Sequence, residues 1–161
     1  MLNQRKKNWL SWTVIAVWLI ATSVFLFWWR FADFGIFDQQ SEWLDQAPSR
    51  VNVTGDVIFH VRSGCLCDPL ADRHDKLIQQ YDQYQQRRVK PAEMEALGIP
   101  VPATPMLVIV EQGKVIYSGP YATGPTCSPE QSFLPQLLDS ERRITTPWYN
   151  GNVKACRCVL E

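Results

Sequence analysis

Residues 98–119 read GIPVPATPMLVIVEQGKVIYSG and hold the clearest strand signal in the chain. Residues 106–110 (MLVIV) form a continuous apolar run of strand length, which indicates a strand covered on both of its faces. Residues 111–114 (EQGK) have the composition of a turn, and residues 115–118 return as a second strand. The stretch therefore predicts a β-hairpin whose first strand is buried on both faces.

A second strand signal lies upstream, where residues 57–61 (VIFHV) are rich in β-formers and are bounded by turn residues. The chain continues into GCLCDP at residues 64–69, in which Asp68 and Pro69 have the preferences of a helix N-cap and of a first helical residue. Apolar or aromatic side chains then recur every three or four residues, which predicts a helix to about residue 88. They are Leu70, His74, Leu77, Ile78, Tyr81 and Tyr84.

The segments before and after the predicted hairpin indicate shorter elements. Residues 91–102 form a proline-punctuated connection. Ser128 opens a capping-box pattern that predicts a last helix, and Pro135 within it predicts either a kink or a later start of the regular helix. The alternation in residues 153–160 predicts a short terminal strand. The residues that share one face of this strand are Cys156, Cys158 and Leu160.

The N-terminal segment predicts a membrane anchor. Residues 9–29 contain no charged side chain, and a helix of this length matches a hydrocarbon core about 30 Å thick. Tryptophans lie at both ends of the run, where amphipathic rings prefer the membrane interfaces. The run closes on aromatic residues and Arg30 without a small-residue cleavage site, which favours an uncleaved anchor over a signal peptide. Residues 1–8 are basic, so the positive-inside bias predicts that they are cytoplasmic and that the rest is exported.

We therefore expect four parts along the chain. They are a cytoplasmic basic tail (1–8), a transmembrane signal-anchor helix (9–29), a membrane-proximal stalk (30–50) and a folded domain (51–161). All sixteen acidic residues but only twelve of the sixteen basic ones follow residue 30, which leaves a net charge of −4. This mild acidity predicts no nucleic-acid partner. No Ser-His-Asp order or phosphate-binding loop is evident, and we expect no cofactor.

All five cysteines fall in the part of the chain that we expect to be exported. In an oxidising compartment at least some of them should be paired, and an odd number leaves one unpaired or available to another molecule. Their spacing does not select one pairing among the many that are possible.

The order of these features resembles the thioredoxin-like superfamily: strand, cysteine-bearing turn, helix, connection, Thr-Pro, strand, glycine turn, strand and helix. The resemblance covers residues 57–139 and is most specific at residues 98–119, where Thr104-Pro105 corresponds to the cis-proline turn of that family. It implies a thioredoxin-like three-layer α/β/α domain with a central mixed sheet. Together with the anchor, it implies a bacterial inner-membrane protein that spans the membrane once and places its domain in the periplasm.

Two departures from the family pattern are visible in the sequence. Cys65-Leu66-Cys67 stands where thioredoxins carry Cys-x-x-Cys, and no strand is evident between the first helix and the Thr-Pro pair. Residues 89–90 alone are too short to supply that strand.

The resemblance also implies thiol–disulfide exchange with other exported proteins. In that function Cys65 is the attacking thiol, Cys67 resolves the mixed disulfide, and Pro105, joined to Thr104 by the cis bond, shapes the docking groove. The N–H groups at the start of a helix favour a thiolate, whereas the neighbouring carboxylate of Asp68 disfavours it.

Alternatives remain open for each group of cysteines. Cys65 and Cys67 either exchange thiols or form structural disulfides in a non-catalytic binding module. Cys156 and Cys158 are either a second dithiol or a structural disulfide that pins the C-terminus. All four together are also a candidate four-thiolate site for copper or zinc. Cys127 is either the leftover thiol or a staple for its loop.

Overall fold

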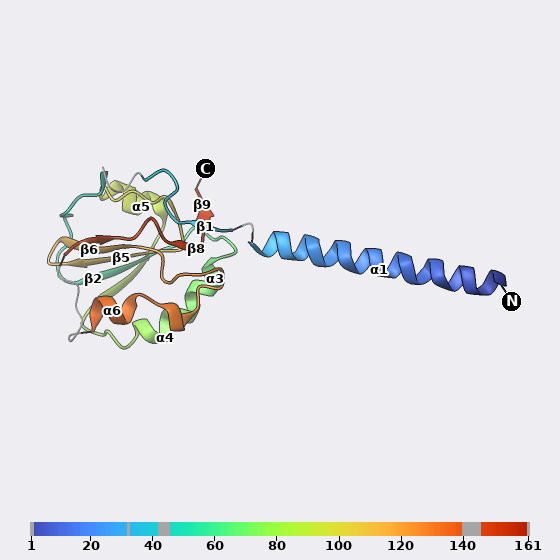
Figure 1. The fold of residues 1–161 in the computed structure, drawn as a ribbon. Coiled ribbons are helices and arrows are strands. Elements are labelled where there is room, and N and C mark those ends of the chain that lie inside the picture. Colours follow the sequence, from blue (N-terminus) through green and yellow to red (C-terminus); the bar gives the residue numbers. More distant parts are fainter. Residues whose placement is uncertain (1, 32, 42–45, 140–145, 161) are drawn as a thin grey trace. The chain divides into compact units, whose positions relative to one another are not determined.

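The computed structural model describes residues 2–31, 33–41, 46–139 and 146–160. The chain divides into two compact units, a helical one that ends at Asp33 and a folded domain that begins at Phe34. Figure 1 shows the single long helix of the first unit and the sheet with its flanking helices in the second.

The first unit consists of helix α1, Leu2–Phe31. Within it, Ser11–Trp29 has a mean hydropathy of 1.8 and none of the segment is buried in protein. Nineteen residues of helix extend about 28 Å, close to the thickness of a hydrocarbon core. This helix is therefore long and apolar enough to cross a membrane.

The second unit contains a five-stranded mixed sheet with the order β3-β2-β5-β6-β7. The central strand β2, Val57–Val61, pairs in parallel with β3, Gln85–Val89, and antiparallel with β5, Met106–Glu111. The predicted hairpin is confirmed, because β5 continues through a turn into β6, Lys114–Gly119. Strand β7, Trp148–Tyr149, adds to β6 in parallel.

Helices cover both faces of this sheet (Figure 1). Their bounds are α3 Asp68–Ala71, α4 Asp75–Ile78, α5 Pro91–Ala96 and α6 Leu134–Leu138. All five residues of β2 are buried, and its alternate side chains enter two separate hydrophobic clusters. Phe59 packs in the cluster that contains Met94 of α5. Ile58 packs in the cluster that contains residues of α3, α4 and α6. The sheet therefore separates two cores, as strand alternation requires.

The predicted helix that runs to about residue 88 is wrong. The helical segment consists of α3, a 3-10 turn at Asp72–His74 and α4, and it ends at Ile78. The strand that the sequence appeared to lack is β3, whose first four residues are exposed. Because β3 is an edge strand of the sequence QQRRV, it has no apolar alternation that would distinguish it from a helix surface.

Of the C-terminal elements, the last helix follows one of its two predicted alternatives, and the terminal strand differs from its prediction. A 3-10 turn at Pro129–Gln131 precedes α6, so the regular helix starts late and accommodates Pro135 in its first turn. The predicted terminal strand is two strands that belong to different sheets: β8, Lys154–Cys156, and β9, Cys158–Val159. The pairing partner of β8 is β1, Phe34–Ile36, and the partner of β9 is β4, Ala103–Thr104.

Most of the segment that we expected to be a stalk, residues 30–50, belongs to the folded domain, which begins at Phe34. Phe37 is fully buried, and its N–H donates to the carbonyl of Val153 at 2.9 Å. Asp38 is also buried, and its N–H donates to the carbonyl of Gly151 at 2.8 Å. Residues 32 and 42–45 of the predicted stalk lie outside the described residues. The domain therefore begins near residue 34 rather than at residue 51.

The burial of Phe37 generates a test of this boundary. Phe37→Ala should lower the free energy of unfolding by about 3–5 kcal/mol, because it removes a fully buried aromatic side chain and leaves a cavity. The neighbouring Ile36 is 41% exposed, so Ile36→Ala should cost less than about 1 kcal/mol. Denaturant unfolding of the two variants measures the difference. Equal stabilities would contradict the domain boundary and favour the predicted stalk.

Candidate functional site

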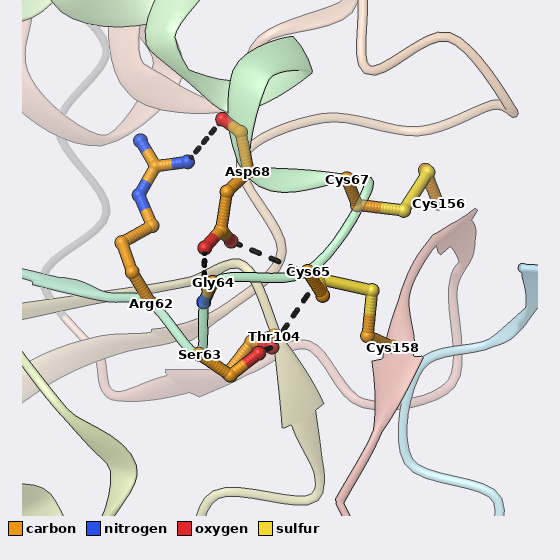
Figure 2. Close-up of a disulfide and its surroundings, with 9 residues drawn as sticks. All are labelled: Arg62, Ser63, Gly64, Cys65, Cys67, Asp68, Thr104, Cys156 and Cys158. Atoms are coloured by element: carbon orange, nitrogen blue, oxygen red, sulfur yellow. Dashed lines mark hydrogen bonds between the residues drawn. A yellow bond between two sulfur atoms is a disulfide. The ribbon is translucent and has the colours of Figure 1, made fainter.

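Two disulfides connect the loop after β2 to the two C-terminal strands (Figure 2). Cys65 is bonded to Cys158, with Cα atoms 6.4 Å apart, and Cys67 is bonded to Cys156, with Cα atoms 6.2 Å apart. Each Cys-x-Cys motif is thus joined to the other motif, and neither forms a bridge within itself. The structure brings four of the predicted site cysteines together in a pairing that the sequence left open.

The two disulfides differ in their accessibility. Cys67 and Cys156 are 1% and 5% exposed and belong to the cluster on the α3 side of the sheet. Cys65 and Cys158 are only partly buried, and Leu66 between the two loop cysteines is exposed. The Cys65–Cys158 bond is therefore the less buried of the two, whereas the Cys67–Cys156 bond lies in the core.

Polar groups from two segments contact the Cys65 sulfur (Figure 2). Its Sγ atom lies 3.8 Å from Oγ1 of Thr104 and 3.8 Å from Oδ1 of Asp68. The Thr104 hydroxyl also shares a hydrogen bond of 2.5 Å with the hydroxyl of Ser63. When the disulfide opens, a thiolate on Cys65 has a hydroxyl donor that favours it and a carboxylate that opposes it.

Asp68 does not act as the predicted N-cap. Helix α3 begins at Asp68 itself, and the preceding residue, Cys67, makes no side-chain capping bond. The Asp68 carboxylate instead accepts a hydrogen bond of 2.7 Å from the N–H of Gly64. Gly64 has a φ of +83°, a conformation that glycine adopts without strain. This turn fixes the position of Cys65 relative to the start of the helix.

The Thr-Pro pair lies beside the less buried disulfide. The Thr104–Pro105 peptide bond is cis, which confirms that prediction. Thr104 is fully buried and belongs to β4, which pairs antiparallel with β9 so that Thr104 faces Cys158 in the register. Thr104 therefore contacts one cysteine of the bond through its hydroxyl and pairs with the other through its backbone.

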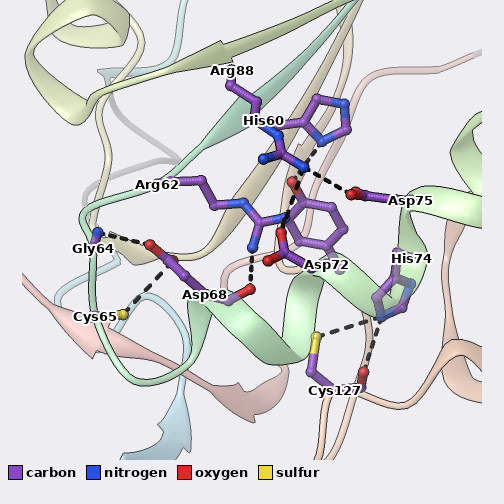
Figure 3. A network of polar contacts seen from close by, with 11 residues as sticks. His60, Arg62, Gly64, Cys65, Asp68, Asp72, His74, Asp75, Arg88 and Cys127 are labelled. Atoms are coloured by element: carbon purple, nitrogen blue, oxygen red, sulfur yellow. Dashed lines mark hydrogen bonds and ion pairs between the residues drawn. The ribbon is translucent and has the colours of Figure 1, made fainter.

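Cys127 is a buried free thiol beside His74 (Figure 3). His74 Nε2 lies 3.0 Å from the carbonyl oxygen of Cys127 and 3.5 Å from its Sγ atom, while Nδ1 lies 3.2 Å from the Ser132 hydroxyl. A carbonyl only accepts, so Nε2 carries the proton and cannot remove one from the thiol. Burial raises the pKa of Cys127 to about 11. Cys127 is thus the leftover thiol, and it is protonated at neutral pH.

A network of charges beside the cysteine loop was not predicted from the sequence (Figure 3). Arg62 Nη1 donates to the carbonyl of Asp68 at 2.8 Å, and Nη2 lies 3.4 Å from the carboxylate of Asp72. Arg88 of β3 contacts Asp72 at 3.7 Å and Asp75 at 2.7 Å. The signal that was available is an arginine directly after a buried strand and three residues before the first cysteine. The contacts of Arg62 and Arg88 together connect the start of α3 to the ends of β2 and β3.

Copper or zinc would need thiolates that this form of the protein does not supply, because all four cysteines of the two motifs are in disulfides. Among the residues that the structure describes, no group of three or more His, Cys, Asp or Glu side chains is arranged to hold a metal ion. The metal alternative therefore remains a prediction for a fully reduced form only.

These observations define a mixed α/β domain that follows a potential membrane helix and carries two disulfides between a central-strand loop and its C-terminus. A family model described as a domain of unknown function (DUF6436) matches residues 37–160, so the chain belongs to the DUF6436 family. The matched region begins at the buried Phe37 and contains all five cysteines. Neither a curated protein nor a solved structure matches the chain.

The nearly coincident positions of the disulfides generate a stability prediction. The bridges span 93 and 89 residues, so either one alone closes almost the same ring. Removing Cys65–Cys158 with a double serine variant should cost about 2 kcal/mol, because only a ring of a few residues opens. Removing Cys67–Cys156 as well should cost about 4–5 kcal/mol more, because the long ring then opens. Urea unfolding of both variants checks this order. If removal of Cys65–Cys158 alone cost the full amount, about 6–7 kcal/mol of stability, the existence of the second bridge would be contradicted.

A buried histidine generates a pH prediction. His60 Nδ1 lies 2.7 Å from the hydroxyl of Tyr121, and burial, assisted by the charge of Arg62, lowers the pKa of His60 to about 4. Unfolding raises this pKa toward its ordinary value of 6.5, so the unfolded chain takes up a proton in that window and acid destabilises the fold. Between pH 7 and pH 4 the natural chain should lose about 3 kcal/mol more than His60→Gln. Unfolding at several pH values measures this, and parallel profiles would contradict it.

Proposed function

We propose that the chain is a membrane-anchored thiol–disulfide exchange protein, and that Cys65–Cys158 is the bond that it exchanges. The observation that carries this proposal is the contrast between its two disulfides. Cys65–Cys158 is only partly buried and lies against Thr104, whereas Cys67–Cys156 is buried and ties the same two segments together. The domain can therefore open the first bond without losing its fold, since exposed disulfides are the ones that exchange readily.

The arrangement of strands supports a thioredoxin-like domain. In the order β3-β2-β5-β6, the first two strands are parallel and the last two form an antiparallel hairpin. The cysteine loop follows β2, and the cis-proline precedes β5. These are the positions that the resemblance to the superfamily predicts for an attacking cysteine and for a docking turn.

The exchange step that we assign begins at Cys65. A thiolate of the partner attacks Cys65 Sγ, the partner–Cys65 disulfide forms, and Cys158 leaves as a thiolate that takes up a proton. A second partner thiol then attacks the partner sulfur of the mixed disulfide, so that the partner becomes oxidised and Cys65 leaves as a thiolate. Two electrons pass from the partner to the domain, and the same steps run in reverse when the domain is the donor.

The roles of the other cysteines follow from their surroundings. Cys158 rather than Cys67 is the residue that resolves the mixed disulfide, because Cys158 is the one bonded to Cys65. Cys67 and Cys156 form the structural staple. Asp68 and Thr104 act on the Cys65 sulfur as an opposing carboxylate and a stabilising hydroxyl.

The compartment is part of the proposal. The apolar helix α1 is preceded by Arg5, Lys6 and Lys7, which the positive-inside bias places in the cytoplasm. The domain then faces the periplasm of a bacterial inner membrane, where disulfides persist and where exported proteins supply partner thiols.

Trapping of the mixed disulfide tests the proposal. In cells that express Cys158→Ser, Cys65 lacks its internal resolving thiol, so partner adducts on Cys65 should accumulate several-fold above the natural chain. Acid quenching, alkylation, non-reducing electrophoresis and mass spectrometry identify the bonded residue. Cys67→Ser is the matched control, because it leaves the Cys65–Cys158 bond intact and should show no increase.

Each contrary outcome has a defined meaning. Adducts on Cys65 in Cys67→Ser but not in Cys158→Ser would return the resolving role to Cys67. Equal absence of adducts in both variants, with each disulfide fully formed in the natural chain, would make the domain a stapled binding module without exchange activity.

A further inference from the structure

The sheet formed by β4 and β9 is unusually small. It contains two residue pairs, Ala103 with Val159 and Thr104 with Cys158. A ladder of this length is weak against the conformational entropy of ordering a chain end. The disulfide from Cys65 to Cys158 reinforces it, and the bond from Cys67 to Cys156 keeps β9 close to β4 even when that disulfide is absent.

Strand β9 contributes little besides its backbone and one sulfur. The Val159 side chain is 59% exposed, and Cys158 is only partly buried. Beyond the strand, Leu160 packs partly against the core. Pairing of this kind does not depend strongly on sequence, which is the property of recognition by strand addition.

The register of this small sheet places the paired cysteine next to the sulfur of Cys65. Thr104 pairs with Cys158, and its Oγ1 atom lies 3.8 Å from the Sγ atom of Cys65. Any extended segment that pairs with β4 and has a cysteine opposite Thr104 consequently delivers that cysteine's sulfur to Cys65. Figure 2 shows Cys158 in this position, with Thr104 and Cys65 beside it.

We propose that β9 is an internal substitute for the partner: it occupies the edge of β4 to which an extended, cysteine-bearing segment of the partner binds, and it has to leave before that segment can pair. This inference rests on the proposed exchange at Cys65. The partner segment runs antiparallel to β4, has its cysteine opposite Thr104 and presents its next side chain to solvent, as Val159 does.

The structure also explains how β9 returns. Cys156, two residues before Cys158, stays bonded to Cys67 when the outer disulfide opens. The released Cys158 thiol therefore remains tethered close to Cys65, because each of these cysteines lies only two positions along the chain from the Cys67–Cys156 bond. Its effective concentration at Cys65 is high. When its thiolate attacks Cys65 in the mixed disulfide, the Cys65–Cys158 bond forms again and the partner leaves as a thiol. The tail thus limits both the binding and the lifetime of the complex.

The test compares a peptide probe with a small reagent on the full-length chain in detergent. Cys158→Ser leaves Cys65 as a free thiol, and the added change Val159→Pro disfavours the pairing of β9 without altering a cysteine, because proline has a fixed φ and no N–H and is disfavoured in paired strands. The probes are Ala-Thr-Ala-Cys-Val-Thr, activated as a mixed disulfide with thionitrobenzoate, and the symmetrical reagent dithiobis(nitrobenzoate). Val159→Ala in the same background is the matched control, because it retains the backbone donor.

We expect Val159→Pro to raise the rate of the peptide reaction about tenfold, because a proline in a ladder of two residue pairs leaves the edge of β4 free for more of the time. The small reagent, which needs no strand edge, should change less than about twofold, and Val159→Ala should react with both probes as its parent does. Protection from hydrogen exchange of whichever of the Ala103 and Thr104 amides faces the paired segment should accompany the faster reaction in the peptide adduct.

An unchanged peptide rate with a normal reaction of the small reagent would overturn this inference and leave the exchange function standing. Failure of Cys65 to react with either probe would remove the proposed function as well. A third outcome concerns Val159→Pro in the chain that keeps all five cysteines. If this variant forms covalent dimers, with Cys65 of one copy bonded to Cys158 of another, and the peptide reaction is no faster, the inference is overturned in favour of strand exchange between copies.

Discussion

The buried bond between Cys67 and Cys156 is the constraint on which the rest of the domain depends. It fixes β8 against the core on the α3 side of the sheet, and β8 in turn pairs with β1 at the start of the domain. Both ends of the domain are thereby attached to the loop that follows the central strand. Because this bond is inaccessible, its neighbour can open while the framework around it remains closed.

The charges beside the loop have a supporting role that complements this bond. Arg62 connects the start of α3 to the end of β2, and Arg88 connects β3 to α4 through Asp75. Ion pairs on an exposed surface contribute little energy, but Arg62 is largely buried and also packs over the ring of Tyr121, with 4.9 Å from its guanidinium carbon to the ring centroid. These contacts hold the loop where Cys65 meets Thr104, independently of whether the outer disulfide is open.

Much of the architecture could be predicted from the sequence where burial leaves an apolar pattern. Residues 57–61 and 106–110 are such stretches, and each is a central strand. The edge strand β3 was missed because its exposed polar residues carry no period. The cysteines of the site were identified, but their pairing was not, since it depends on β8 and β9 returning to the loop from about ninety residues away. Arg62 was missed because its place directly after a buried strand does not reveal which carboxylates it meets in the folded chain.

The edges of the five-stranded sheet give a last consequence. Strand β3 displays Arg87 and Arg88 along its open side, and β7 at the opposite edge is only two residues long. Charge and shortness are the devices by which sheets refuse unwanted strands. The edge of β4 is protected differently, by strand β9, whose disulfide to Cys65 a thiol can open. The permanent edges of the sheet can therefore resist indiscriminate aggregation, while in the proposed exchange the edge of β4 still pairs with one strand that carries a suitably placed cysteine.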